Sequence, residues 1–269
     1  MKNTKLIYLS LILFHMTILS CEKEHEPKPD VISTPDVTSL GIAPVAQYTI
    51  YDDTYNMRYS KDNRMIQLSG NNLSMSQNPL EIQRNGNKYL TNFTLNKAGC
   101  ATYFEEIRPD GKVAIKYHLK YDSNNYLIEI VEETTYNNSF TTTYIRRGKN
   151  GRIESASLYD SDGELSETTN YNYGKNEMPN SHGVFVIESV GMYYYLNLAG
   201  LTGRPSGALP ESYVYTGYAK KGTFNMYGVY KYDIMTDNYV RAVHETVYID
   251  DVSETYTSTY VYKGLYLYD

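Results

Sequence analysis

The sequence predicts an all-β protein: a large antiparallel meander of hairpins that forms a curved sheet or a partly closed barrel, with at most one or two short helices. Three observations support this fold class. Apolar and polar residues alternate with a period of two, as they do in a half-buried strand. Asn-Gly and Asp-Gly pairs separate the alternating runs, and such pairs favour tight hairpin turns. The chain also has 31 tyrosines and no tryptophan, and tyrosine suits a pleated surface that is buried on one side and wet on the other.

The first 20 residues indicate an export signal. Lys2 and Lys5 precede an apolar run from Leu6 to Leu19, which is shorter than the roughly 20 residues of a membrane-spanning helix and typical of a signal peptide. The run ends at Ser20-Cys21, and small or apolar residues before a cysteine resemble the lipobox of bacterial lipoproteins. That resemblance implies a lipoprotein signal peptide over residues 1–20 and lipid attachment at Cys21. The alternative is an ordinary secretory signal with an incidental cysteine.

Residues 21–47 are expected to be a lipid anchor and a proline-rich tether. Four of the nine prolines lie here, and proline fixes an extended backbone, so the segment is predicted to be a semi-rigid spacer. Glu22-Lys23-Glu24 resembles the acidic export signal of Bacteroides-type lipoproteins. This resemblance implies an outer-membrane lipoprotein of the cell envelope that is exposed at the surface. Without the resemblance, the sequence leaves both the inner and the outer face of that membrane open.

The hairpin pattern is clearest in residues 112–165. Val113, Ile115 and Tyr117 alternate with lysines and His118, and Asp122–Asn125 then supplies turn residues. Because the distance from one turn to the next is irregular, the pattern favours hairpins of one sheet over a solenoid. The same turn chemistry recurs along the chain at Asn85-Gly86, Asp110-Gly111, Asn150-Gly151, Asp162-Gly163, Asp237-Asn238 and Asp250-Asp251.

One segment departs from the alternation. Residues 188–200 fit a short helix or a buried strand equally well, and residues 201–210 form a turn-rich loop. This loop contains Gly203, Ser206, Leu209 and Pro210. Together with the tyrosine-rich meander it resembles a family of Bacteroides-type lipoproteins of unknown function with a described porin-like fold. The resemblance covers roughly residues 57–269, departs from the family in lacking tryptophan, and implies no activity.

Two further units, Tyr121-Asp122 and Tyr159-Asp160, resemble the tyrosine-aspartate repeats of large β-shell toxins. Residues 48–269 are therefore expected to form a single all-β domain. The formal net charge is −6, and removal of residues 1–20, which include Lys2 and Lys5 and no acid, makes it −8. That balance argues against nucleic acid as a partner, since nucleic-acid binding needs a basic stripe.

Motifs for catalysis, metals or cofactors are not evident. The five histidines lack metal-ligand spacing, and in Asp160–Glu164 the glycine stands too early for an EF-hand loop. Cys100 is expected to be a small buried apolar group rather than a nucleophile. No cofactor and no metal site are predicted, and the chain is expected not to be an enzyme. A glycosidase-type carboxylate pair stays open, because the sequence alone does not select two of 31 acids.

Tyrosines of equal parity near the C-terminus form the candidate partner-binding face, because alternate residues of a strand share one side of a sheet. The alternative is that these rings cover the core. The hypothesis is a membrane-anchored, non-catalytic envelope lipoprotein that binds a polymer, a glycan or an envelope protein through this face. An envelope structural or pilus-type subunit, or a hydrolase with an unrecognised carboxylate pair, are the alternatives. The candidate face consists of Tyr256, Tyr260, Tyr262, Tyr266 and Tyr268.

Overall fold

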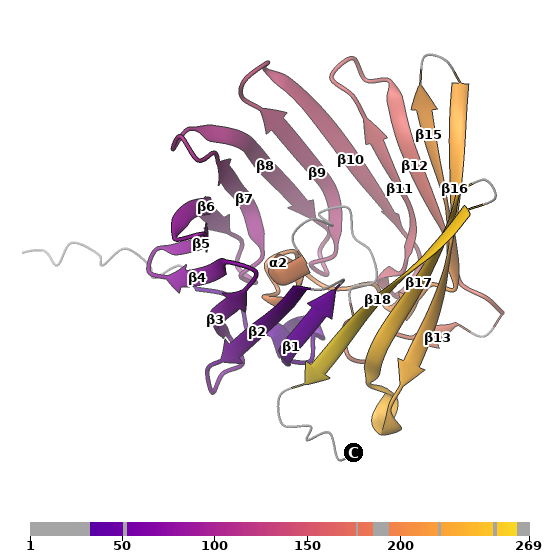
Figure 1. Cartoon of the computed structure of the whole chain (residues 1–269), viewed down its shortest axis with the longest axis horizontal. Helices are drawn as coiled ribbons and strands as arrows, with labels where there is room; N and C mark the ends of the chain where they lie inside the picture. Colours follow the sequence, from indigo (N-terminus) through magenta and orange to yellow (C-terminus); the bar gives the residue numbers. More distant parts are fainter. Residues whose placement is uncertain are drawn as a thin grey trace, which may run out of the picture. The chain divides into compact units, whose positions relative to one another are not determined.

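The structure, a computed structural model, describes residues 33–50, 53–175, 177–184, 194–219, 222–249 and 252–262. Sixteen antiparallel strands form one closed barrel, in which β1 pairs with β18 (Figure 1). The all-β prediction is confirmed, and the closure is complete rather than partial. The barrel strands are β1 (Val45–Ile50), β2 (Asp53–Tyr59), β3 (Met65–Gly70), β4 (Leu73–Gln77), β5 (Leu80–Arg84), β6 (Asn87–Leu95), β7 (Ala101–Ile107), β8 (Val113–Tyr121), β9 (Leu127–Thr134), β10 (Ser139–Arg147), β11 (Ile153–Tyr159), β12 (Leu165–Asn172), β15 (Ser212–Ala219), β16 (Gly222–Ile234), β17 (Val240–Ile249) and β18 (Val252–Tyr262).

The predicted turns join consecutive strands. Asn150 and Gly151 both have positive φ, 59° and 71°, between β10 and β11, and Gly163 has φ 78° between β11 and β12. A left-handed backbone suits asparagine and glycine, which explains these residue types at the tips of the hairpins. The predicted Asp250-Asp251 turn lies outside the described residues.

The two ends of the barrel differ in what covers them. We call the end of the barrel at which β1 begins and β18 ends the base, and the opposite end the rim. The connection from β12 to β15 lies at the base and contains the short sheet β13 (Met178–Pro179) with β14 (Ala208–Leu209), and the helix α2 (Tyr194–Leu198). Its buried residues join those of the strands in one apolar core. Other short elements are the 3₁₀ turns η1 (Val37–Leu40), η2 (Lys149–Gly151) and η3 (Thr236–Asn238).

Helix α2 lies inside the ring of strands (Figure 1). The ring of Tyr194 is 5.5 Å from that of Tyr48 on β1, and Tyr59 on β2 donates to the Leu198 carbonyl at 3.3 Å. Gly200, two residues after the end of the helix, has a φ of 73°, as expected for the left-handed residue that follows a helix C-terminus. Of the two structures left open for residues 188–200, the helix is present at Tyr194–Leu198, and residues 188–193 lie outside the described ranges. None of the described helices has the length and hydropathy of a membrane span.

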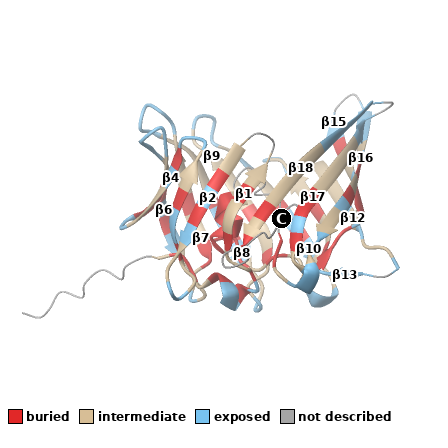
Figure 2. Ribbon diagram, turned by 60° about the horizontal axis from the view of Figure 1, so that its bottom comes forward, coloured by how far each residue is buried: buried red, intermediate tan, exposed pale blue. Residues whose placement is uncertain are grey.

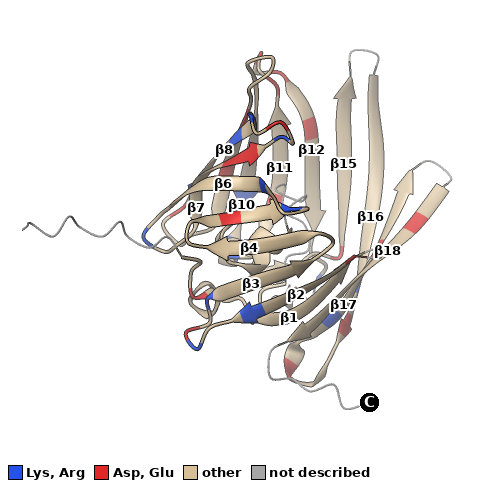
Figure 3. Cartoon of the chain, turned by 60° about the vertical axis from the view of Figure 1, so that its left-hand side comes forward, with Lys and Arg blue, Asp and Glu red and all other residues tan. Residues whose placement is uncertain are grey.

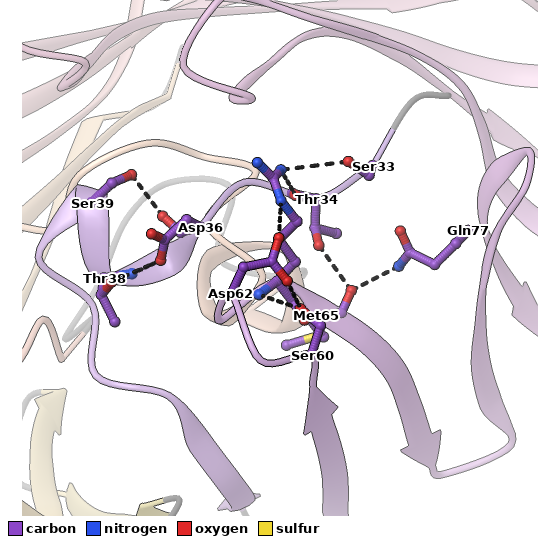
Figure 4. A network of polar contacts seen from close by, with 10 residues as sticks. Ser33, Thr34, Asp36, Thr38, Ser39, Ser60, Asp62, Met65 and Gln77 are labelled. Atoms are coloured by element: carbon purple, nitrogen blue, oxygen red, sulfur yellow. Dashed lines mark hydrogen bonds and ion pairs between the residues drawn. The ribbon is translucent and has the colours of Figure 1, made fainter. Parts of the chain in front are cut away.

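The folded unit begins earlier than the predicted boundary at Tyr48. In the segment assigned to the tether, Val37, Leu40 and Ile42 are buried. Figure 4 shows how this segment is fastened to the turn between β2 and β3: Arg64 Nη1 donates to the Thr34 carbonyl at 2.6 Å, and Thr34 Oγ1 donates to the Met65 carbonyl at 2.8 Å. Residues 33–47 are therefore part of the folded unit. The expected signal peptide, Cys21 and the remaining tether residues lie outside the described residues.

Candidate functional site: the two walls of the barrel

The predicted tyrosine face belongs to the inner wall. Tyr260 and Tyr262 are each 4% exposed, with the Tyr260 ring 4.9 Å from that of Tyr48 and the Tyr262 hydroxyl donating to the Val240 carbonyl at 2.9 Å. Tyr256 pairs with Glu245 on the same wall and is half-buried. These tyrosines do share one side of the sheet, but that side faces the core. The rings of Tyr260 and Tyr262 therefore pack in the core and are not exposed for a partner to bind. Tyr266 and Tyr268 lie outside the described residues.

Carboxylates accompany the inward tyrosines. The Tyr213 hydroxyl donates a hydrogen bond to Glu245 at 2.7 Å, and the Tyr117 hydroxyl donates one to Glu106 at 3.4 Å. These contacts explain how tyrosine replaces phenylalanine on a mainly apolar wall, because a buried hydroxyl needs a partner. Sequence reasoning missed these acids, although each shares the parity of neighbouring apolar residues.

The inner wall also raises the pKa of two of its acids, Glu132 and Glu245. Burial raises the pKa of Glu132, and the negative charge of Glu106 raises it further. Burial likewise raises the pKa of Glu245, against the hydrogen bond from Tyr213 that lowers it. Such carboxyls hold a proton more readily than exposed ones and can donate it in a hydrogen bond. Within the described residues, no group of three or more His, Cys, Asp or Glu side chains is arranged to hold a metal ion.

The predicted turn residues are used locally. In the turn from β11 to β12, the Asp160 carboxylate accepts hydrogen bonds from the backbone amides of Asp162, at 3.0 Å, and Glu164, at 2.9 Å. Cys100 is completely buried, and burial raises the pKa of its thiol to about 11. The thiol is therefore protonated at neutral pH, and the interpretation of Cys100 as a buried apolar group is confirmed.

The outer wall is polar. On β8 the outward residues Lys116, His118 and Lys120 alternate with buried Tyr117 and Leu119. In the register between β8 and β9, Lys116 stands opposite Glu133 and Lys120 stands opposite Glu129. Each lysine forms an ion pair with the glutamate opposite it, at 2.8 Å for Lys116–Glu133 and 2.5 Å for Lys120–Glu129. The two walls therefore differ in chemistry: the inner wall is mainly apolar and tyrosine with a few carboxylates, and the outer wall is mainly charged or hydroxyl-bearing.

Charge is unevenly distributed around the outer wall. The strands β7 to β11 carry most of it, and we call their outward face the charged arc. The second region runs over β12, β15, the rim halves of β16 and β17, β18, β1 and the rim half of β2, and we call it the uncharged arc; Figure 3 shows β15 without any charged residue. Its described outward side chains are Gln47, Thr49, Thr54, Asn56, Thr168, Asn170, Asn172, Ser212, Val214, Thr216, Tyr218, Thr223, Asn225, Tyr227, Val229, Thr246, Tyr248, Ser253, Thr255, Thr257, Thr259 and Val261.

Two hollows indent the outer wall. One, of about 410 Å³, lies over β6, β7 and the turn to β8, and includes Lys88 and Glu105. The other, of about 380 Å³, includes Arg146, Arg152 and Glu154. The cations that line them already have acidic partners: Lys88 lies 3.3 Å from Glu81, and Arg146 lies 3.3 Å from Glu154. These cations are therefore not available as unpaired charges for a ligand.

Fold and walls together define a class: a closed antiparallel barrel with an apolar inner wall, a base filled by a helix and its flanking loops, and a polar outer wall. No protein-family model matches the sequence, and no curated protein matches it either. Among the solved structures that resemble the chain is the crystal structure of a porin-like protein from Bacteroides uniformis. It superposes with a TM-score of 0.62 at 15% sequence identity, over 82% of this chain and 99% of that one. At this identity the likeness shows the porin-like all-β fold.

Proposed function

We propose that the protein is a lipid-anchored envelope protein whose barrel stands in water beside the membrane, and that it acts by binding rather than by conducting solutes or by catalysis. The observation that carries this proposal is the polar outer wall. A barrel that crosses a bilayer shows the opposite arrangement, an outward apolar band about 25 Å tall around a polar interior.

The energetic argument rests on the charged arc. Lys116, Lys120, Glu129 and Glu133 point outward from β8 and β9, and Lys116 lies near the middle of its strand. Lysine on the lipid-facing side of a barrel costs about 2–4 kcal/mol at the bilayer midplane, so several such groups oppose insertion. In water the same residues form exposed ion pairs at little cost.

The interior supports binding over conduction. The base contains Tyr195, Leu196 and Leu201, which are at most 3% exposed, and a packed core does not pass solutes. Acyl chains on Cys21 would supply the membrane attachment that the outer wall lacks, because one residue with several chains binds a bilayer firmly. Since β1 begins at the base, the tether would leave from that end.

Cell fractionation and solution behaviour test the proposal together. Residues 22–269, expressed without the signal and the cysteine, are expected to stay monodisperse without detergent. In cells, Cys21→Ala is expected to move the protein from the membrane pellet to the soluble fraction. A truncated chain that needs detergent, or a Cys21→Ala protein that remains in the membrane after a high-pH wash, contradicts the proposal.

A further inference from the structure

The uncharged arc contains a row of half-exposed apolar and aromatic side chains. Val214 on β15 pairs with Tyr227 on β16, and Tyr227 pairs with Tyr248 on β17. These three side chains are 42%, 45% and 43% exposed, and the two tyrosine rings lie 6.1 Å apart. The row therefore crosses three neighbouring strands on the outer wall and presents ring surface to solvent.

Hydroxyl and amide groups border the row on both sides. Toward the rim, Thr216 donates to Asn225 at 2.8 Å, and toward the base Thr246 and Thr255 share a hydrogen bond at 2.9 Å. Each of these groups keeps further donor or acceptor capacity, since a hydroxyl has one donor and two lone pairs. Within the described residues the row and its two borders contain no Lys, Arg, Asp or Glu.

We propose that this row, Val214–Tyr227–Tyr248, is a docking surface for a linear neutral polysaccharide. A sugar ring has an apolar face that packs on a tyrosine ring and an equatorial rim of hydroxyls that matches threonine and asparagine. Tyrosine also gives large contact area at low entropic cost. A charged polymer would lose hydration on this surface without meeting an opposite charge.

The narrow width of the row favours a polymer chain over a folded protein as the partner. A specific protein interface buries about 800 Å² on each partner around an apolar centre. Here the row of Val214, Tyr227 and Tyr248 is one residue wide and bordered by polar rows, and Tyr218, which is 43% exposed, lies beyond the border formed by Thr216. A linear chain lies along such a row and contacts one ring after another. The inference rests on the proposed function in one respect, because the outer wall has to face water.

The charged arc supplies a matched control. Tyr144 and Tyr159 form another outward tyrosine pair, with rings 5.7 Å apart and Tyr144 50% exposed. Tyr144 stands opposite Glu129, beside the Lys120 ion pair. Tyr144→Ala with Tyr159→Ala therefore removes the same kind of ring pair from a charged setting.

Affinity electrophoresis of the detergent-free protein tests the inference. The gels contain a linear α-glucan, a linear β-glucan or a galactomannan, and polygalacturonate or dextran sulfate as charged polymers. We expect retardation by at least one neutral polymer, insensitive to 0.5 M salt because no ion pairs form. Tyr227→Ala with Tyr248→Ala should weaken it at least about tenfold, which is about 1.4 kcal/mol, and the control pair should leave it unchanged.

Three outcomes overturn the inference: no retardation by any neutral polymer, retardation by charged polymers only, or equal loss in both double variants. Circular dichroism of each variant at a single temperature verifies that the barrel is intact, and Tyr227→Phe, which keeps the ring, should retain binding. A failure of the proposed function has a different signature, since that protein would not stay in solution without detergent.

Discussion

The base and the rim of the barrel share the same alternation of inward and outward residues, but their inward residues are buried to different extents. At the base, inward residues such as Leu127 and Ile153 are at most 4% exposed, whereas at the rim inward Phe224, Ile249 and Val252 are 51%, 47% and 71% exposed. In Figure 2 the rim ends of β15 and β16 are drawn as exposed. Inward direction alone therefore does not bury a side chain; a second layer has to cover it.

The second layer comes from the connections at the base. Leu196 and Leu198 of α2 and Leu201 after it join the inward residues of the strands in one core. The loop that follows is fixed by close backbone approach at Gly207, where an added Cβ would lie 1.9 Å from the Asn150 carbonyl oxygen. Substitutions of matched type in the core and at the rim measure how much this layer contributes.

The largest difference in stability between a core variant and a rim variant is expected when a phenylalanine is replaced. Phe104 is completely buried between Phe93 and Tyr117, with ring centroids 5.3 and 4.5 Å away. Phe104→Ala should lower the free energy of unfolding by about 3–5 kcal/mol, because it leaves a cavity. Phe224→Ala, at the rim, should lower it by less than about 1 kcal/mol. Urea unfolding of both variants measures the difference, and equal losses would show that the rim is packed as tightly as the core.

A smaller difference is expected at two glycines that lie under aromatic rings. A Cβ at Gly228 would meet the Tyr213 ring at 1.9 Å, and that ring is 7% exposed and held by Glu245. Gly228→Ala should therefore cost about 1–3 kcal/mol of stability, the range for overpacking. Gly217 lies under Phe224 in the same way, at 2.2 Å, but the exposed ring can move aside. Gly217→Ala should change the melting temperature much less, and a reversed order would contradict the comparison.

The smallest effect is a pH dependence at two adjacent glutamates on opposite walls. The pKa of inward Glu132 is raised by burial and by Glu106, whereas the pKa of outward Glu133 is lowered by its hydrogen bond with Lys116. For Glu132 the folded state binds more protons, so its contribution to stability is present below pH 4.5 and declines as pH rises toward its raised folded pKa. Glu133 has the opposite sign: its contribution is present above pH 4.5 and is lost as pH falls through its lowered folded pKa.

Stability measured between pH 3 and pH 8 tests both signs. Relative to the wild type, Glu132→Gln should gain stability as pH rises, and Glu133→Gln should lose it. Both side chains are partly exposed, so solvent screening keeps the effects small. The same slope in both variants would show that the two walls do not differ in electrostatic environment.

Much of the fold could be predicted because hairpins are encoded locally. Asn85, Asn150 and Asp237 take the left-handed backbone that their turns require, and these residue types carry the signal on their own. The alternation in residues 113–121 also predicted correctly which residues share a wall. Such signals depend only on neighbours in the chain, and so they can be found without a structure.

Which wall faces inward depends on distant parts of the chain. Parity placed Tyr260 and Tyr262 together, but tyrosine suits either side of a sheet, and only closure of the barrel decides between them. The exposed pair Tyr227 and Tyr248 was missed for the same reason. The buried start of the folded unit was missed because proline composition outweighed Val37 and Leu40, whose burial depends on the β2–β3 turn and the loop after α2.

Closure between β1 and β18 has a consequence for how the chain folds. The Tyr48 hydroxyl contacts Ser258 at 3.3 Å across 210 residues of sequence, so the last barrel strand is needed before the first has both neighbours. Until then β1 presents an unpaired edge, and such edges promote pairing with other chains. Contacts of this separation also slow folding. Pairing of β1 with β18 is therefore the step that removes the two open edges, and loss of β18 would leave both edges open for aggregation.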